Sequence, residues 1–149
     1  MEESLETFNK CDIFTPDEIS LLMSNKLSTN SISLLEPSVG TGNLLKYINL
    51  NNYEIIDVYE LKTNYLDEIL DERINKHNCD FLKAEINQKY DSIILNPPYI
   101  RIQDLPKSYR TFLREEFQLN GNLDIYYAFI IKCLNLLSEK WNNGCYNTK

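Results

Sequence analysis

Hydrophobic and polar positions along the chain fall into short blocks that predict strands and helices in alternation. Short apolar or β-branched runs predict four strands, at 31–37, 53–60, 77–82 and 92–95. Apolar positions at helical spacing predict five helices, at 16–27, 43–48, 63–74, 105–117 and 124–140. Strands that alternate with helices indicate βαβ units, so the expected fold class is α/β with a doubly wound, mainly parallel sheet.

Local signals set several of the element boundaries. Thr15 is expected as the N-cap of the first helix, with Pro16 at its first position and Glu18 at its third. The fourth strand is ended by Pro97 and Pro98, because proline cannot donate to a strand ladder.

The size and composition fit one globular domain. The chain has 149 residues, of which 43% are hydrophobic, which is enough for a packed core. No repeat or linker interrupts residues 1–149, so they are expected to form one domain with a frayed start at Met1–Lys10. No apolar run reaches the length of a membrane span, and the acidic N-terminus does not look like a signal peptide.

The cysteines and the one histidine give no sign of a metal site. Four cysteines lie far apart, without the spacing of a zinc site or of a disulfide framework: Cys11, Cys79, Cys133 and Cys145. We expect reduced thiols in a cytoplasmic protein and no bound metal. His77 is expected at the surface.

The net charge limits how the chain can hold nucleic acid. It is −7 at neutral pH, whereas a protein that grips DNA by neutralising phosphates is expected to be basic. The chain could act on DNA if another domain or subunit supplies the basic surface.

A glycine turn follows the first strand and is the first candidate for ligand binding. The turn reads EPSVGTG at 36–42, and its glycines let the backbone approach a ligand closely. Parallel sheets bind ligands beyond the carboxyl ends of their strands, above all at the first βα turn, where a helix N-terminus offers free N–H groups. Glu60 ends the next strand, where a carboxylate can accept both hydroxyls of a ribose. An adenosine-containing cofactor is therefore expected.

Two features distinguish between the possible cofactors. The dinucleotide pattern GxGxxG is absent, because Gly42 is followed by Asn43 and two leucines. Glu36 would repel a pyrophosphate but attract the cationic end of S-adenosylmethionine (AdoMet). The turn therefore favours AdoMet over a nicotinamide dinucleotide.

The segment NPPY at 96–99 follows the fourth strand, at the same edge of the sheet as the glycine turn. Its prolines fix the backbone and leave carbonyls without intramolecular partners. Asn96 Oδ1 and the Pro97 carbonyl can each accept one hydrogen of an NH2 group, while Tyr99 can stack on a planar ring. Such a site suits methylation of an amine, for which positioning supplies most of the rate.

Five segments in this order resemble the motif series of AdoMet-dependent adenine-N6 DNA methyltransferases of the restriction-modification type. They are FTP at 14–16, EPSVGTG at 36–42, Glu60, CDF ending at Phe81, and NPPYIR at 96–101. The later stretch REEFQLNGNLDIYYAFIIKCLNLL is also similar, so the resemblance covers nearly the whole chain. It implies the Rossmann-like fold of class I AdoMet methyltransferases.

The resemblance also implies roles for individual residues. AdoMet would be bound by residues of four motifs: Phe14, Thr15, Pro16, Glu36, Pro37, Ser38, Gly40, Gly42, Glu60, Asp80 and Phe81. Of these, the FTP residues would close over the methionine end, Glu60 would hold the ribose, and Asp80 would bond the cofactor's adenine. A target adenine flipped out of the duplex would be held by Asn96, Pro97, Pro98 and Tyr99.

Residues of the last predicted helix are harder to interpret. Asp124 and Tyr126 match positions that family members also carry, but no chemistry follows for them from the sequence. Core packing is expected for Phe129, Ile130 and Leu134.

Compared with that family, the C-terminal strands and a target-recognition domain are expected to be missing. The chain would then be a truncated catalytic domain, a subunit encoded by a split gene, or a decayed remnant. DNA would be contacted through a domain or subunit outside this chain, and a partner subunit could complete the sheet.

Three other functions stay open at this point. A protein-glutamine N5 methyltransferase shares NPPY, although the FTP segment and Glu36-Pro37 count against it. A cytosine-N4 or RNA-base methyltransferase would use neighbouring chemistry. A non-catalytic fragment would bind AdoMet or a partner subunit and transfer nothing.

Overall fold

The computed structural model describes residues 14–139, which form two compact units. One unit comprises residues 14–96 and 135–139, and the other comprises residues 97–134. Among the residues described, no helix is long and apolar enough to cross a bilayer. The expectations for Met1–Lys10, Cys11 and Cys145 fall outside these residues, and the single domain stays a prediction.

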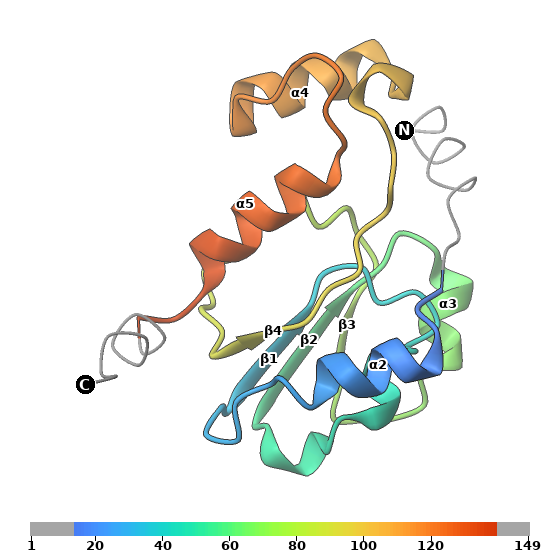
Figure 1. Cartoon of the computed structure of the whole chain (residues 1–149), viewed down its shortest axis with the longest axis vertical. Coiled ribbons are helices and arrows are strands. Elements are labelled where there is room, and N and C mark those ends of the chain that lie inside the picture. Colours follow the sequence, from blue (N-terminus) through green and yellow to red (C-terminus); the bar gives the residue numbers. More distant parts are fainter. Residues whose placement is uncertain (1–13, 140–149) are drawn as a thin grey trace. The chain divides into compact units, whose positions relative to one another are not determined.

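The first unit is built on a four-stranded parallel sheet (Figure 1). Its strands are β1 (Ser33–Glu36), β2 (Ile55–Tyr59), β3 (Asn75–His77) and β4 (Ser92–Ile93). They lie in the order β3-β2-β1-β4, and every pairing is parallel. This order, in which the chain first moves to one side of β1 and then crosses to the other, confirms the predicted doubly wound parallel sheet.

The third strand lies earlier in the chain than predicted. The segment 77–82 was expected to be extended, but β3 ends at His77. From Asp80 the chain makes a turn instead, in which Lys83 N and Ala84 N donate to the Asp80 carbonyl at 3.1 and 3.0 Å. The prediction of a strand at 77–82 is therefore wrong, because this segment forms a turn after His77 and does not pair with the sheet.

The segment after the glycine turn also differs from its prediction. An α-helix was expected at 43–48, but the chain forms two single 3-10 turns, η1 (Leu45–Tyr47) and η2 (Leu50–Asn52). Between them, the Asn49 side chain accepts a hydrogen bond from Asn51 N at 3.2 Å, which competes with helical bonding. The helix N-terminus expected behind the glycine turn is therefore not formed.

The first described helix, α2 (Asp17–Ser24), starts without a side-chain cap. Pro16 occupies the N-cap position, and its carbonyl accepts from Ser20 N at 2.9 Å. The expectation that Thr15 caps this helix is therefore wrong. The Thr15 hydroxyl instead accepts a hydrogen bond from Asn96 Nδ2, 81 positions later.

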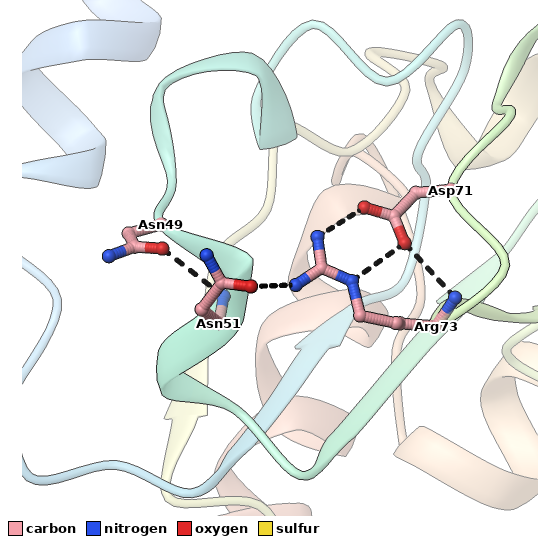
Figure 2. A network of polar contacts seen from close by, with 4 residues as sticks. All are labelled: Asn49, Asn51, Asp71 and Arg73. Carbon is pink, nitrogen blue, oxygen red and sulfur yellow. Dashed lines mark hydrogen bonds and ion pairs between the residues drawn. The ribbon is translucent and has the colours of Figure 1, made fainter.

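The second helix, α3 (Thr63–Glu68), is half as long as expected because the chain turns at Asp71 (Figure 2). Asp71 Oδ1 accepts from both N and Nε of Arg73, at 3.0 and 2.9 Å. Arg73 Nη1 also donates to Asn51 Oδ1, which ties this turn to η2. The Arg73 guanidinium lowers the pKa of Asp71 to about 2.

The apolar core of this unit lies around the sheet. Its buried members come from the strands and from the segments that follow β1 and β2: Leu34, Val39, Leu44, Leu45, Ile56, Val58, Leu66, Ile69, Ile74 and Ile94. Burial of their side chains is the main favourable contribution to folding here.

One carboxylate is buried beside this core and is satisfied by three side chains. Asp57 on β2 is 8% exposed. Its Oδ2 accepts from Tyr90 Oη at 2.5 Å, and its Oδ1 accepts from Asn75 Nδ2 at 2.9 Å and lies 3.3 Å from His77 Nε2. Tyr90 also pairs through its backbone with residues 136–138, at the end of the last helix and just after it. The network joins β2, β3 and the segment that enters β4.

The second unit contains α4 (Lys107–Phe117) and most of α5 (Tyr126–Leu136), whose last two residues belong to the first unit. Both agree with the predicted helices except at their ends. Within this unit Phe129 is buried as expected, but Ile130 and Leu134 are 39% and 62% exposed. The expectation of core packing is wrong for these two, because their side chains are exposed.

The Asp57 network predicts a measurable stability difference. Tyr90→Phe removes the hydroxyl and leaves a buried carboxylate oxygen without its donor, so we expect the free energy of unfolding to fall by about 1–3 kcal/mol. Urea denaturation measures this. Tyr47→Phe, at a side chain 36% exposed, removes a hydroxyl whose hydrogen bond to Asp17 lies at the surface. It is the control for loss of an exposed hydroxyl and is expected to change stability by less than about 0.5 kcal/mol. Equal effects of the two substitutions would contradict the importance of the network.

Candidate functional site

The glycine turn at the end of β1 has a backbone that only glycine adopts readily. Gly40 and Gly42 have φ of +53° and +85°. Val39 N donates to the Tyr59 carbonyl at 3.0 Å, which holds the turn at the end of β2. A Cβ on Gly40 would lie 3.5 Å from the Phe14 ring, an ordinary contact, so conformation rather than space requires glycine there.

Glu60, directly after β2, fixes the same turn. Its Oε2 accepts from Gly40 N at 3.0 Å and its Oε1 accepts from Lys62 N at 2.9 Å. Its own N–H donates to the His77 carbonyl at 3.1 Å. Each carboxylate oxygen can accept a second hydrogen bond, so two ligand hydroxyls can be held without breaking the turn.

Glu36, the last residue of β1, is a buried acid beside the turn. It is 1% exposed, and among the described residues its Oε2 has no hydrogen-bond partner. Burial, and then the nearby Glu60 carboxylate, raise its pKa well above the ordinary value. A buried acid without a donor is unfavourable on its own and becomes favourable when a cationic donor binds it.

The residues of the FTP segment lie against the glycine turn. The Phe14 ring is 44% exposed and meets the Tyr65 ring edge-on, with centroids 5.8 Å apart. The Thr15 carbonyl accepts from Asn43 Nδ2 at 3.3 Å, which attaches the segment to the residue after Gly42. Asn43 was not singled out from the sequence as a site residue, because its role depends on a contact 28 positions away.

Asn96 is held by two hydroxyl groups from different segments. Its side-chain Nδ2 donates to Thr15 Oγ1 at 2.9 Å, and its main-chain carbonyl accepts from Ser38 Oγ at 3.2 Å. Ser38 belongs to the glycine turn, next to the buried Pro37. The structure therefore brings Asn96 together with two residues of the predicted cofactor site.

Asp80 and Phe81 follow β3 at the same end of the sheet. Asp80 Oδ1 accepts from Leu82 N at 3.0 Å. Phe81 is 2% exposed and packs edge-on against Tyr59, with ring centroids 5.3 Å apart. Tyr59 in turn stacks on the His77 ring at 4.5 Å. This aromatic group supports the ends of β2 and β3 from inside.

The rest of the NPPY segment belongs to the second unit. Pro97 is buried there, while Tyr99 is 54% exposed and its ring centroid lies 6.2 Å from that of Tyr126. Tyr126 stacks on Tyr127 at 4.2 Å. Three tyrosine rings thus lie next to one another, and the first of them directly follows the two prolines in the chain.

Asp124 has a structural role that the sequence did not reveal. Its Oδ1 accepts from Ile100 N at 3.2 Å and from Tyr126 N at 3.1 Å. The carboxylate thus joins the residue after NPPY to the first residue of α5. The local signal for half of this role was present, because an aspartate two residues before a helix often accepts such a bond.

The described residues contain no group of three or more metal-ligating side chains. Of the described cysteines, Cys79 is exposed and Cys133 is buried. Burial raises the pKa of Cys133 to about 12, which makes it a poor nucleophile. His77 is half-exposed and is occupied by its contacts with Tyr59 and Asp57.

Comparison with known proteins agrees with this arrangement. A model of the Eco57I restriction-modification methylase family matches residues 17–146. Type II methyltransferase M.AccI of Acinetobacter calcoaceticus is 30% identical, over 95% of this chain and 28% of that protein. Type II methyltransferase M.HincII of Haemophilus influenzae is 32% identical, over 81% of this chain and 24% of that protein. The chain spans about a quarter of the length of these relatives.

A solved structure shares the fold at low sequence identity. A Listeria monocytogenes protein assigned to the class I S-adenosylmethionine-dependent methyltransferases has a TM-score of 0.60 and 16% identity. The likeness covers 84% of this chain and 43% of that protein. It confirms the Rossmann-like class I methyltransferase fold.

The buried Glu36 predicts a pH-dependent stability difference for the ligand-free protein. The pKa of Glu36 is higher in the folded than in the unfolded protein. Its contribution to the free energy of unfolding is therefore complete below the unfolded pKa of about 4.5, and this stability is lost as the pH rises towards the folded pKa. Glu36→Gln cannot ionise, so the variant should gain stability over the original protein between about pH 5 and pH 8. Urea denaturation at both values measures the gap. A gap of the same size at both would show that Glu36 ionises freely in the fold.

Proposed function

Because the chain belongs to the Eco57I restriction-modification methylase family, we propose that it is the AdoMet-binding and methyl-transferring part of an adenine-N6 DNA methyltransferase. The observation that carries this proposal is the double attachment of Asn96. Ser38 donates to the main-chain carbonyl of Asn96, and the Asn96 side-chain amide donates to Thr15. Asn96 therefore lies beside the glycine turn that we propose binds the cofactor. A methyl donor and an acceptor amine could meet there.

The charges of the glycine turn support AdoMet as the cofactor. Its cationic ammonium group can donate to the unpartnered Glu36 Oε2 and so relieve the cost of that buried acid. Glu60 can hold the ribose through the acceptor capacity that its bonds to Gly40 and Lys62 leave. Phe14–Pro16 would cover the methionine end, and Asp80 and Phe81 would adjoin the adenine.

The proposed reaction requires no strong base. Asn96 Oδ1 and the Pro97 carbonyl each accept one hydrogen of the adenine amino group and orient its lone pair towards the methyl carbon. Bound AdoMet would supply the methyl group: its S–CH3 bond would break as the new C–N bond forms, and S-adenosylhomocysteine would be released. The methylated amine then loses one proton to water. The site contributes by positioning and by the electron density that the two acceptors induce on the nitrogen.

DNA is the proposed substrate because the relatives are Type II methyltransferases. A base inside a duplex cannot reach a site at a sheet edge, so the target adenine must be flipped out, and Tyr99 could then stack on it. The acidic chain, at −7, would depend on other parts of the enzyme for most phosphate contacts.

The two acids predict different losses of ligand affinity, which calorimetry can separate. Glu60→Gln should weaken AdoMet and adenosine alike, by about 1–3 kcal/mol, because both ligands carry the ribose. Glu36→Gln should weaken AdoMet by a similar amount and leave adenosine unchanged, because adenosine lacks the ammonium group. Glu54→Gln, an exposed acid just before β2, is the control. Adenosine affinity that is unchanged in Glu60→Gln would contradict the ribose site.

Asn96→Ala should keep AdoMet affinity and lose methyl transfer to DNA, by about 100-fold or more, because the amine loses one of its two acceptors. The measurement uses methyl-labelled AdoMet, mixed-sequence DNA and separation of the digested nucleosides. Asn64→Ala, on the exposed surface of α3, is the control and should transfer normally. Label in N6-methyldeoxyadenosine is expected. Label in another base, or equal transfer by the two variants, would contradict the assignment.

A further inference from the structure

We infer that Thr15 is a positioning residue for Asn96, in addition to its proposed contact with the cofactor. The Thr15 hydroxyl accepts a hydrogen bond from Asn96 Nδ2 and thereby turns Asn96 Oδ1 towards the amine that is to be methylated. The inference rests on the proposed function and adds to it a residue that fixes the orientation of the acceptor amide.

The contact is well formed on both sides. Thr15 is 7% exposed, and the distance from Asn96 Nδ2 to its Oγ1 is 2.9 Å, an ordinary hydrogen-bond length. Among the described residues no hydrogen bond to Asn96 Oδ1 is found, so the oxygen is available as an acceptor. The donor end of the amide is therefore occupied and its acceptor end is open.

The orientation of this amide matters because its two ends have opposite hydrogen-bonding character. An amide oxygen accepts, whereas the NH2 group only donates. An exocyclic amine that keeps its lone pair for attack presents hydrogens to the site, so an amide turned by half a rotation would oppose donor to donor. A partner that occupies Nδ2 stabilises the productive orientation before the substrate arrives.

Both ends of the Thr15–Asn96 bond are attached to the glycine turn. Asn43 Nδ2 donates to the Thr15 carbonyl at 3.3 Å, and Asn43 Oδ1 lies 3.5 Å from Thr41 Oγ1. Ser38 Oγ donates to the Asn96 carbonyl at 3.2 Å. The turn thus holds the main chain at both residues, and the hydroxyl–amide bond orients the side chain of Asn96.

The test compares two substitutions at Thr15 in the full chain. Thr15→Val keeps the shape and removes the hydroxyl, and we expect kcat for DNA methylation to fall roughly 10- to 100-fold. Thr15→Ser keeps the hydroxyl and should restore kcat to within about threefold. Both variants keep the Thr15 main chain, and Thr15→Val also keeps the side-chain shape that would cover the cofactor, so the dissociation constant of AdoMet and the KM for DNA should change less than about threefold. Thr29→Val, in an exposed turn, is the control for the substitution itself.

The kinetic outcomes separate this inference from the proposed function. An unchanged kcat in Thr15→Val, with transfer lost in Asn96→Ala, would overturn the positioning role and leave the proposed function standing. Weaker AdoMet binding at constant kcat would show that Thr15 contacts only the cofactor and would also overturn it. Absence of transfer by the unsubstituted chain with AdoMet bound would overturn both.

A second measurement needs no activity. The side-chain amide protons of Asn96 can be assigned in nitrogen-15 NMR spectra by their loss in Asn96→Ala. We expect one of them to shift in Thr15→Val and to return towards its original position in Thr15→Ser, because the acceptor of Nδ2 is removed and then restored. A signal that does not move in Thr15→Val would overturn the inference whatever the kinetics show.

Discussion

The arrangement of the site depends on one hydrogen bond, from Gly40 N to Glu60 Oε2. The bond joins the turn after β1 to the residue after β2, so it places a ligand-binding loop and an acid side by side. The same carboxylate accepts from Lys62 N and thereby fixes its own position. A turn with two residues of positive φ would otherwise be free to adopt several shapes, and the glycines that permit its shape also make it entropically costly to fix.

The same turn contains an acid whose burial opposes folding. Glu36 is inaccessible to water, has an unpartnered oxygen and lies near the second carboxylate of the site. A sequence selected for stability alone would replace it with an apolar residue. Its presence agrees with a site whose buried charge costs folding free energy until a cationic ligand binds. Such a ligand would fill the site and also stabilise the fold.

Long-range structure explains which predictions succeeded. The doubly wound parallel sheet followed from buried apolar runs, because two-sided burial leaves a strong local signal in Leu34, Ile56 and Val58. The segment after the glycine turn has the apolar spacing of a helix, but the prediction of a helix was wrong. The Asn49 side chain accepts from Asn51 N and begins a second turn, which Arg73, 22 positions beyond Asn51, holds in place. Local patterns likewise could not predict the contact of Asn43 with Thr15 or that of Asp124 with Ile100, because these partners lie 28 and 24 positions away.

Thr15 illustrates how a failed local rule can indicate function. Threonine, proline and two acids in succession form a strong helix-start signal, yet the hydroxyl does not cap α2. A missing side-chain cap costs a helix about 1 kcal/mol, and at α2 the acids of the first turn, Asp17 and Glu18, offset part of it. The hydroxyl is instead directed to the amide of Asn96, the residue on which the proposed chemistry depends. Departures from local consistency concentrate at functional sites, because there a long-range contact outweighs the local preference.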